Sequence, residues 1–215
     1  HLTRAGALRL SPGLKRSSLI GGIRYYDTVV DDARHTMTVA RTAAHYGAVV
    51  RCSTQVVALL REGDRVIGVG VRDSENGAVA EVRGHVVVNA TGVWTDEIQA
   101  LSKQRGRFQV RASKGVHVVV PRDRIVSDVA IILRTEKSVM FVIPWGGHWI
   151  IGTTDTDWNL DLAHPAATKA DIDYILGTVN AVLATPLTHA DIDGVYAGLR
   201  PLLAGESDDT SKLSR

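Results

Sequence analysis

The chain has 215 residues, enough for a sizeable core in one large domain or two small ones. Hydrophobic residues make up 45% and charged residues 22%, a globular composition that excludes a largely disordered chain. The net charge of +2, without a basic run interleaved with aromatics, gives no indication of nucleic-acid binding. No apolar run is long enough to span a bilayer, and the first residues are not a signal peptide.

The first part of the chain predicts a loop, a strand and a helix. Residues 1–20, which contain Gly, Pro, Ser and basic residues, predict a linker or loop, and residues 21–30 predict a short strand. A helix follows, because apolar residues recur at spacings of three and four. Asp31 or Asp32 can cap its start, and Gly47 can end it.

Short strands dominate the next part. Residues 48–52 predict one strand, and three runs within 54–84 predict an antiparallel meander with an Asn-Gly hairpin turn. Residues 85–90 predict a buried strand. Residues 93–102 predict a helix with acidic side chains in its first turn, where the helix dipole favours them.

The second half predicts a β-rich antiparallel region. Residues 107–122 and 130–155 contain several alternating or apolar runs separated by turn residues. Thr168 can cap a helix with one apolar face, which ends before Pro186. Residues 194–203 predict a buried strand that runs into a turn.

The small residues Ala90, Thr91 and Gly92 lie between a predicted strand and a predicted helix. Small residues after a strand let the backbone approach another group closely, and free N–H groups at a helix start favour anions such as pyrophosphate. A tight strand-to-helix turn would look the same, so the residues alone leave both interpretations open.

Polar groups interrupt three apolar runs. Lys114 and His117 lie three apart on a strand, which places them on opposite faces unless Gly115 kinks the chain. An edge lysine and a packed histidine are the simpler interpretation. Residues 152–155, Gly-Thr-Thr-Asp, can bind a polar ligand or form a turn. Arg200 needs an anionic partner if buried, either a ligand or a structural carboxylate such as Asp155 or Glu206.

Other signals are weak. The Gly-Val-Gly at 68–70 lacks the third glycine of a dinucleotide fingerprint, and the histidines lack metal-ligand spacing, so we expect no metal. The single cysteine, Cys52, cannot form an internal disulfide, which fits a reducing compartment. We expect it to be a small buried residue rather than a nucleophile.

Several motifs nevertheless occur in one order: GGIRYYDTVVDDARH, VNATGVWTD, SKGVHVVVPR, FVIPW, IIGTTD and GLRPLL. This order resembles the FAD-dependent (aerobic, membrane-associated) glycerol-3-phosphate dehydrogenases over residues 21–202. VDDAR, SKGxH, IGTTD and GxRPL together are specific, whereas VNATG is shared by many flavoproteins.

The chain departs from that pattern at both ends. The family's N-terminal glycine fingerprint, the basic residues that clamp the substrate phosphate and the glycine-rich C-terminal segment do not occur here. Residues 203–205, Leu-Ala-Gly, stand where the family has an acidic, cysteine-containing run. We therefore expect a central fragment of a longer protein, which by itself neither holds FAD tightly nor turns over.

The resemblance implies an α/β (mixed α+β) fold on the two-domain plan of the D-amino-acid-oxidase-like flavoproteins, with part of an FAD-binding Rossmann-type domain and an antiparallel-sheet substrate domain. Residues 1–20 would be a linker or loop. Residues 21–105 would belong to the FAD-binding domain with its meander, the first strand being shared with the substrate domain. Residues 106–190 would form the substrate-binding sheet and helix, and residues 191–215 would return to the FAD domain.

The resemblance also carries roles to matching positions. His117 would lie at the flavin and accept the proton of the substrate's C2 hydroxyl, a task that suits a group with a pKa near neutrality. Arg200 would hold the substrate and the developing charge, and Lys114 and Thr153 would line the same pocket. The residues expected to contact FAD are Val56, Val57, Ala90, Thr91, Gly92, Gly198 and Leu199.

The implied reaction is oxidation of sn-glycerol 3-phosphate to dihydroxyacetone phosphate, with hydride transfer to FAD and electrons passed to quinone. The resemblance further implies a cytoplasmic location with peripheral association on the inner face of the cell membrane, and it is compatible with a homo-oligomer. Three alternatives stay open. They are a related flavin-dependent oxidase whose amino-acid or amine substrate pairs with Arg200, a non-catalytic interaction segment, and a β-rich binding module, which the ordered motifs disfavour.

Overall fold

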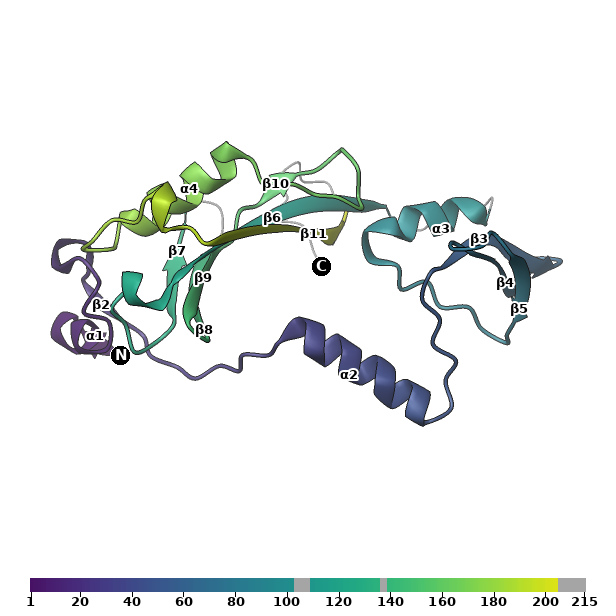
Figure 1. Ribbon diagram of the computed structural model, residues 1–215, viewed down its shortest axis with the longest axis horizontal. Helices are drawn as coiled ribbons and strands as arrows, with labels where there is room; N and C mark the ends of the chain where they lie inside the picture. The colour runs from purple at the N-terminus through teal and green to yellow at the C-terminus, as the bar shows by residue number, and fades with distance from the viewer. Residues whose placement is uncertain (103–108, 136–138, 205–215) are drawn as a thin grey trace. The chain divides into compact units, whose positions relative to one another are not determined.

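The computed structural model describes residues 1–102, 109–135 and 139–204. Figure 1 labels the elements in chain order. The helices are α1 (Arg4–Leu10), α2 (Asp32–His45), α3 (Thr95–Leu101) and α4 (Lys169–Asn180), with 3₁₀ turns at Arg16–Ser18, Gly92–Trp94, Arg122–Arg124 and His189–Asp191. The strands are β1 (Leu2–Thr3), β2 (Gly21–Gly22), β3 (Thr54–Glu62), β4 (Arg65–Asp73), β5 (Val79–Arg83), β6 (Val110–Pro121), β7 (Ile131–Arg134), β8 (Val139–Trp145), β9 (His148–Gly152), β10 (Thr156–Asp157) and β11 (Gly194–Leu203).

The described chain divides into two compact units. The first contains residues 1–24, 92–94 and the described part of 107–215, and the second contains residues 25–91 and the described part of 95–106. β11 pairs with β6 over all of its residues, and both strands lie in the first unit.

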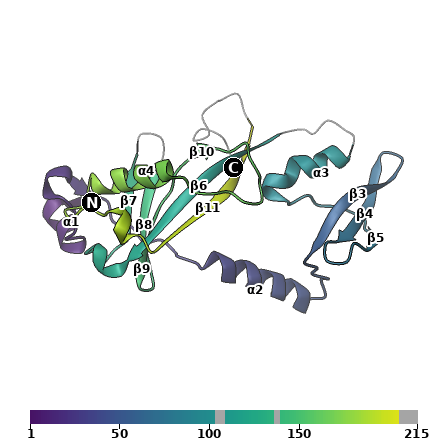
Figure 2. The same cartoon turned by 45° about the horizontal axis from the view of Figure 1, so that its top comes forward.

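The first unit is built on an antiparallel sheet whose longest strand is β6. β11 pairs with β6 from Val110 to Val119. On the other side of β6, β9 pairs with residues 117–121 and the short β10 pairs with Ser113 and Lys114. β8 and β7 extend the sheet beyond β9, as Figure 2 shows. This arrangement confirms the predicted antiparallel region and the mixed fold class.

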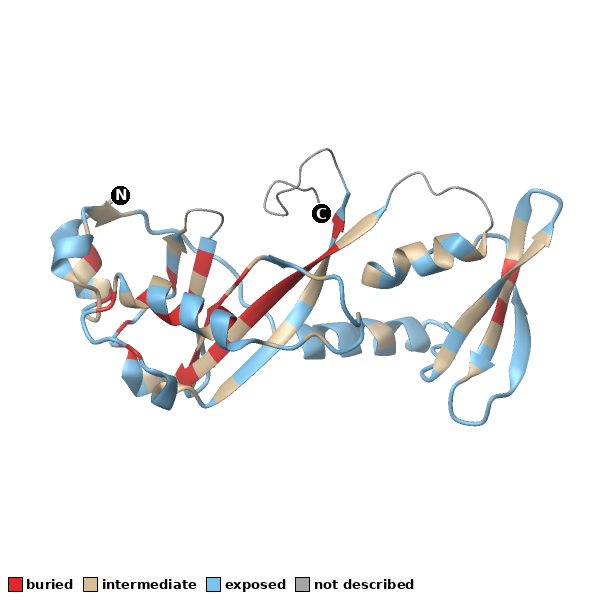
Figure 3. Ribbon diagram, turned by 90° about the horizontal axis from the view of Figure 1, so that it is seen from above, coloured by how far each residue is buried: buried red, intermediate tan, exposed pale blue. Residues whose placement is uncertain are grey.

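The hydrophobic core lies on one face of β6. Val116, Val118 and Val120 alternate along the strand and are fully buried, and Figure 3 shows buried residues gathered along it. α4 covers this face with Ile175 and Val179, also fully buried. Each such side chain contributes about 1.5–3 kcal/mol on burial, so this layer fixes which face of the strand points inward.

A buried ion pair ties the start of α4 to β6. The Thr168 hydroxyl and the Asp171 carboxylate form a capping box at the helix start. Asp171 Oδ2 also accepts a hydrogen bond of 2.7 Å from Lys114 Nζ, and the two side chains are 6% and 4% exposed. Burial opposes ionisation of Asp171, but the hydrogen bonds from Lys114 and Thr168 outweigh it and hold the carboxyl pKa below its usual range.

The second unit contains the predicted meander and two predicted helices. β3, β4 and β5 pair in sequence order, and Gly77, with φ +78°, forms the turn between β4 and β5. Asp31 caps α2 by accepting a hydrogen bond of 3.0 Å from Arg34 N, and Gly47 follows its end with φ +94°. These predictions of a cap, a stop and a hairpin turn are confirmed.

Two predicted strands are not formed, and the strand predicted at 21–30 is limited to its first two residues, Gly21–Gly22. Residues 23–30, 48–52 and 85–90 form no strand, and Val86 and Val88 are 77% and 79% exposed. A strand needs a neighbouring strand to share its backbone hydrogen bonds, and no strand of the described residues pairs with these runs. The prediction that Cys52 is buried is wrong for the same reason, since the thiol lies in an unformed strand and is exposed.

Two further predictions need correction. The supposed loop 1–20 contains α1, whose cap Thr3 accepts a hydrogen bond of 3.2 Å from Gly6 N. The short run after this cap, Arg4–Leu10, contains alanines and leucines that favour a helix. The prediction of a loop followed the Gly, Pro and Ser content of residues 1–20 and overlooked this run. The strand 194–203 is formed, but only Leu202 in it is buried, because β11 is an edge strand paired with β6 alone within the described sheet.

None of the described helices combines the length and the apolar character that a bilayer crossing requires.

Because the ion pair between Lys114 and Asp171 is buried, we expect that removing the charge of Asp171 strongly lowers the stability of the protein. Asp171→Asn should lower the free energy of unfolding by about 3 kcal/mol at neutral pH, because it leaves the Lys114 charge buried without its partner. The folded-state pKa of Asp171 is lowered, so this stabilisation is complete above the unfolded pKa of about 4 and is lost as pH falls through the folded value.

Urea denaturation at a series of pH values measures this effect. The difference between wild type and variant should shrink below about pH 4. Asp173→Asn is the matched control, because Asp173 forms an exposed pair with Lys169 and its loss should cost far less. Equal effects of the two substitutions would contradict the buried role of Asp171.

Candidate functional site

β6 carries the candidate site on the face opposite the core. The strand runs without interruption through Gly115, so Lys114 and His117 point to opposite faces, and the alternative of a kink is wrong. Across β11, Tyr196 is the partner of His117 and Gly198 is the partner of Gly115. Tyr196, Gly198 and Arg200 therefore share the face that carries His117.

Arg200 is anchored across the sheet. Its Nη2 donates to Thr153 Oγ1 at 2.7 Å and its Nη1 donates to the Thr154 carbonyl at 3.2 Å. A Cβ atom on Gly115 would lie 2.4 Å from Arg200 Nη2 and 2.6 Å from Thr153 Oγ1. The guanidinium thus crosses β6 directly above Gly115, and any larger residue there would displace it.

Thr153 is presented by the chain between β9 and β10. In this segment the hydroxyl of Thr154 bonds to backbone groups of β6 in place of a neighbouring strand. It accepts a hydrogen bond of 3.0 Å from Val116 N and donates one of 3.3 Å to the Lys114 carbonyl. The Gly152–Thr153 peptide bond is cis. Asp155, in the same segment, accepts a hydrogen bond from Ser113 Oγ. The sequence left open whether residues 152–155 bind a ligand or form a turn. Thr154 and Asp155 form hydrogen bonds within the protein itself.

His117 lies between two neighbouring strands. Its ring stacks on Tyr196 with centroids 4.9 Å apart and planes 11° from parallel. A Cβ atom on Gly152 would lie 2.5 Å from His117 Cδ2, so the glycine makes room for the ring. Burial, followed by the nearby Arg200 charge, lowers the pKa of His117 below its ordinary value. The imidazole is therefore neutral at pH 7 and can accept a proton.

Lys114 does not join this cluster. Its ammonium bonds to Asp171 and, at 3.2 Å, to the Ala166 carbonyl, and it lies 5.2 Å from the centre of the Trp158 ring. The side chain is 4% exposed and points to the core face. The expected substrate role of Lys114 has no support in this placement, and a structural role replaces it.

The residues expected at the FAD pyrophosphate are divided between the units. Ala90 and Thr91 belong to the second unit, whereas Gly92 begins a 3₁₀ turn that lies beside β6 and β11 in the first unit. Gly92 has φ +58° and open space where a Cβ would stand. Asn89 Oδ1 accepts from Thr91 Oγ1 at 2.7 Å and from Thr91 N at 3.3 Å, so Asn89 shapes this turn.

The remaining expected cofactor residues lie on strands. Val56 and Val57 are half-buried on β3, at a break in its register with β4. Gly198 and Leu199 lie on β11, and open space surrounds the missing side chain of Gly198. The structure thus brings His117, Gly198, Leu199 and Arg200 into one sheet, with Thr153 in the segment that follows β9. Leu199 is the partner of Lys114 and shares its face, opposite to that of His117.

Sequence reasoning missed Tyr196 and the close approach at Gly152. The signal for Tyr196 was present, because period two places it on the Arg200 face of a predicted strand. The signal for Gly152 was a single glycine at the end of an apolar run, which is also typical of a turn.

The fold is that of the FAD-binding oxidases and dehydrogenases. The chain superposes on the glycerol-3-phosphate dehydrogenase of Bacillus halodurans, solved in complex with FAD, with a TM-score of 0.89 and 33% identity over 96% of this chain and 42% of that one. The match to a glycine oxidase of Bacillus cereus has a TM-score of 0.75 and 26% identity over 97% of this chain and 56% of that one. The model of the FAD dependent oxidoreductase family matches residues 1–213, and the chain belongs to that family.

Curated relatives agree with this family. The chain is 99% identical over all 215 residues to glycerol-3-phosphate dehydrogenase 2 of Mycobacterium tuberculosis and covers 37% of that protein. It is 36% identical over 212 residues, 96% of its length, to the alpha-glycerophosphate oxidase of Streptococcus pneumoniae, of which it covers 35%. The chain therefore spans just over a third of the length of these relatives.

Gly115 allows a test of the anchored arginine. Gly115→Ala should displace Arg200 from Thr153 while the fold persists, because the new methyl group meets the ends of side chains rather than backbone. NMR signals of the Arg200 guanidinium should shift, with a small change in melting temperature.

Two other glycines serve as controls. Gly198→Ala should leave the Arg200 signals in place, because nothing lies within 4 Å of the added Cβ. Gly152→Ala should instead lower the melting temperature, because its Cβ would lie 2.7 Å from the Val116 carbonyl oxygen. Unchanged Arg200 signals in Gly115→Ala would contradict the described crossing.

Proposed function

We propose that this chain supplies the substrate face and part of the FAD site of an enzyme that oxidises sn-glycerol 3-phosphate to dihydroxyacetone phosphate. One observation carries the proposal: half-buried His117 and Arg200, which is anchored to Thr153, share one sheet face. Burial lowers the pKa of His117, which suits a proton acceptor. The Mycobacterium tuberculosis and Bacillus halodurans relatives, both named glycerol-3-phosphate dehydrogenases, support it.

Two features of the described residues fit a flavin cofactor. Nothing among the described residues lies within 4 Å of the Cβ position of Gly92, so a ligand could approach the chain closely there. Gly198, also open, leaves a flat area on the sheet beside His117 and Arg200 where a planar ring can lie. We propose that Ala90, Thr91 and Gly92 hold the pyrophosphate and that Gly198 and Leu199 lie against the ring system. Val56 and Val57 would lie near the adenosine.

The chemistry divides between the cofactor and this chain. Bound FAD would supply the acceptor for the hydride that leaves C2 of the substrate. His117 would take the proton of the C2 hydroxyl, so that loss of one hydride and one proton turns the alcohol into a ketone. Arg200, held in place by Thr153, would stabilise the negative charge that develops on the C2 oxygen.

The domain roles and the electron acceptor belong to the same proposal. Residues 21–105 would contribute to the FAD-binding domain and residues 106–190 to the substrate domain, with β11 completing the substrate sheet. Electrons would pass to quinone at the inner face of the cell membrane. The motif resemblance supports this part, and reduction of a soluble quinone by glycerol 3-phosphate tests it.

A second candidate is a flavin oxidase for an amino acid or amine. The likeness to the Bacillus cereus glycine oxidase favours it, because Arg200 would pair equally well with a substrate carboxylate. Anaerobic addition of glycine derivatives would then bleach the flavin, and glycerol 3-phosphate would not.

A visible spectrum provides the first test of the proposed reaction. In the Mycobacterium tuberculosis relative, which contains the regions outside this chain, bound flavin should bleach when glycerol 3-phosphate is added without oxygen. The isolated chain should bind FAD weakly and show no turnover. Robust turnover by the isolated chain would contradict the expectation that its site is incomplete.

Substitutions in that relative, at the matching positions, test the residue roles. His117→Gln should lower kcat about 10²–10⁴-fold, the usual contribution of a general base. Arg200→Met should lower kcat/KM about 10²–10³-fold, as the loss of one charge-stabilising donor does. Arg134→Met is the control, because Arg134 is an exposed arginine of the same sheet. Near-normal rates in His117→Gln would exclude the histidine as the base.

A further inference from the structure

The ring of Tyr196 stacks on one face of the His117 ring. The two residues are cross-strand partners on β11 and β6, and their rings stack within 11° of parallel. We propose that Tyr196 is a positioning residue that fixes the His117 imidazole for proton transfer from the substrate. This inference rests on the proposed function, and it extends that function to a residue that contacts the base rather than the substrate.

The packing around His117 determines which part of the ring is free. Tyr196 covers one ring face, and Gly152 lies against the Cδ2–Cγ edge. Among the contacts of the described residues, neither ring nitrogen of His117 has a hydrogen-bond partner. A stack on one face and a backbone against one edge therefore orient the ring while its nitrogens stay available for a ligand.

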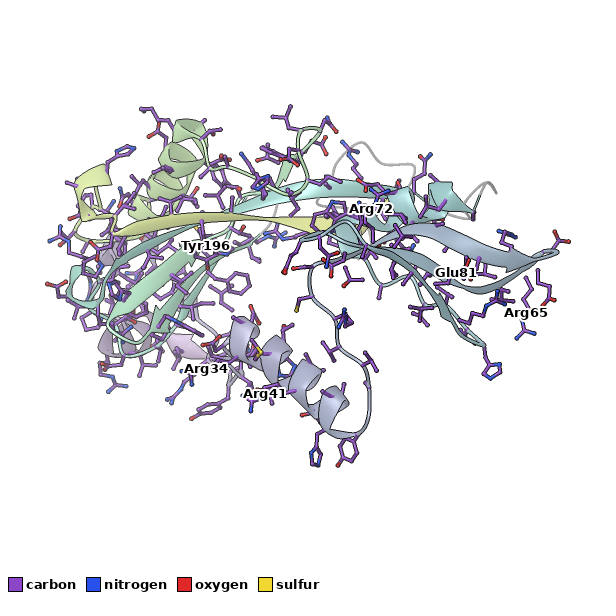
Figure 4. The ribbon with its side chains drawn as sticks, turned by 45° about the vertical axis from the view of Figure 1, so that its right-hand side comes forward. Arg34, Arg41, Arg65, Arg72, Glu81 and Tyr196 are labelled. Carbon is purple, nitrogen blue, oxygen red and sulfur yellow. The ribbon has the colours of Figure 1, made fainter. Side chains whose placement is uncertain are left out.

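Stacking is the contact that holds the ring in the absence of a hydrogen bond. General bases are commonly oriented by a third group that accepts a hydrogen bond from the second ring nitrogen. No described residue does this for His117, so the aromatic contact and the glycine are what restrict its rotation. Tyr196, labelled in Figure 4, lies on β11 and is 48% exposed. Its ring stacks on the imidazole of His117.

The charged and titratable groups that face His117 come from two strands. β11 contributes the Arg200 guanidinium and the Tyr196 phenol, and the Thr153 hydroxyl follows β9. On β6 itself, Lys114 points to the core face. Since burial is the larger cause of the lowered pKa of His117, removing the Tyr196 ring should return water to the imidazole and raise that pKa toward its ordinary value.

NMR titration of the chain tests the positioning directly. The Cε1–H signal of His117, assigned by its loss in His117→Gln, should titrate below the ordinary histidine value in wild type. Tyr196→Phe keeps the stack and should titrate as wild type does. Tyr196→Ala should titrate at higher pH, toward the ordinary value of about 6.5.

Two further variants keep this test decisive. Val195→Ala removes an apolar side chain from the adjacent position of β11, on the other face, and should leave the His117 titration unchanged. Tyr196→Leu retains bulk without a ring and replaces Tyr196→Ala if the latter does not fold. Unchanged titration in both Tyr196→Ala and Tyr196→Leu, or an equal shift in Tyr196→Phe, would overturn the proposal.

The catalytic consequence is measured in the Mycobacterium tuberculosis relative. At the matching positions, Tyr196→Ala should lower kcat about 10- to 100-fold, the scale of a misplaced catalytic group, with KM little changed. The acid limb of its kcat/KM profile should move to higher pH, and Tyr196→Phe should restore both. A shifted NMR titration with an unshifted acid limb would also overturn the proposal. Failure of the proposed function would appear differently, as no turnover of glycerol 3-phosphate by wild type.

Discussion

The alternation of side chains along β6 is the constraint on which the rest of this unit depends. Val116, Val118 and Val120 enter the core, and that burial obliges the residues between them to face the other way. The favourable free energy of burying Val116 and Val118 therefore keeps His117 on the opposite face. The ion pair of Lys114 with Asp171 acts in the same sense, because it fixes the strand against α4 beyond the end of the valine run.

The candidate site is formed as much by missing side chains as by present ones. Gly115 gives Arg200 a path across β6, and Gly152 leaves room for the edge of the imidazole. The Thr154 hydroxyl takes over the backbone pairing where the chain departs from β9, which allows Thr153 to meet the guanidinium. Small residues and one irregular segment thus allow a charged group to lie within a regular sheet.

Sequence reasoning succeeded where the cause of a structure is local. The caps Asp31 and Thr168 and the turn at Gly77 act within a few residues, and each was predicted. The strand at 85–90 was not formed, because a strand also requires partners that its own residues do not specify. In the site, the alternation placed Lys114 opposite His117, but its partner Asp171 lies 57 positions later and depends on how α4 packs. The stack of Tyr196 on His117 likewise depends on the register of two distant strands.

The bond from Arg200 to Thr153 joins β11 to the end of β9 across the strand between them. This bond forms only in the correct register of the sheet. A shift of β11 by one residue would turn the guanidinium to the opposite face, and a shift by two would carry it away from Gly115. A chain folded with either strand out of register therefore has no assembled site. Correct assembly of the sheet and the appearance of the site are, for this unit, a single event.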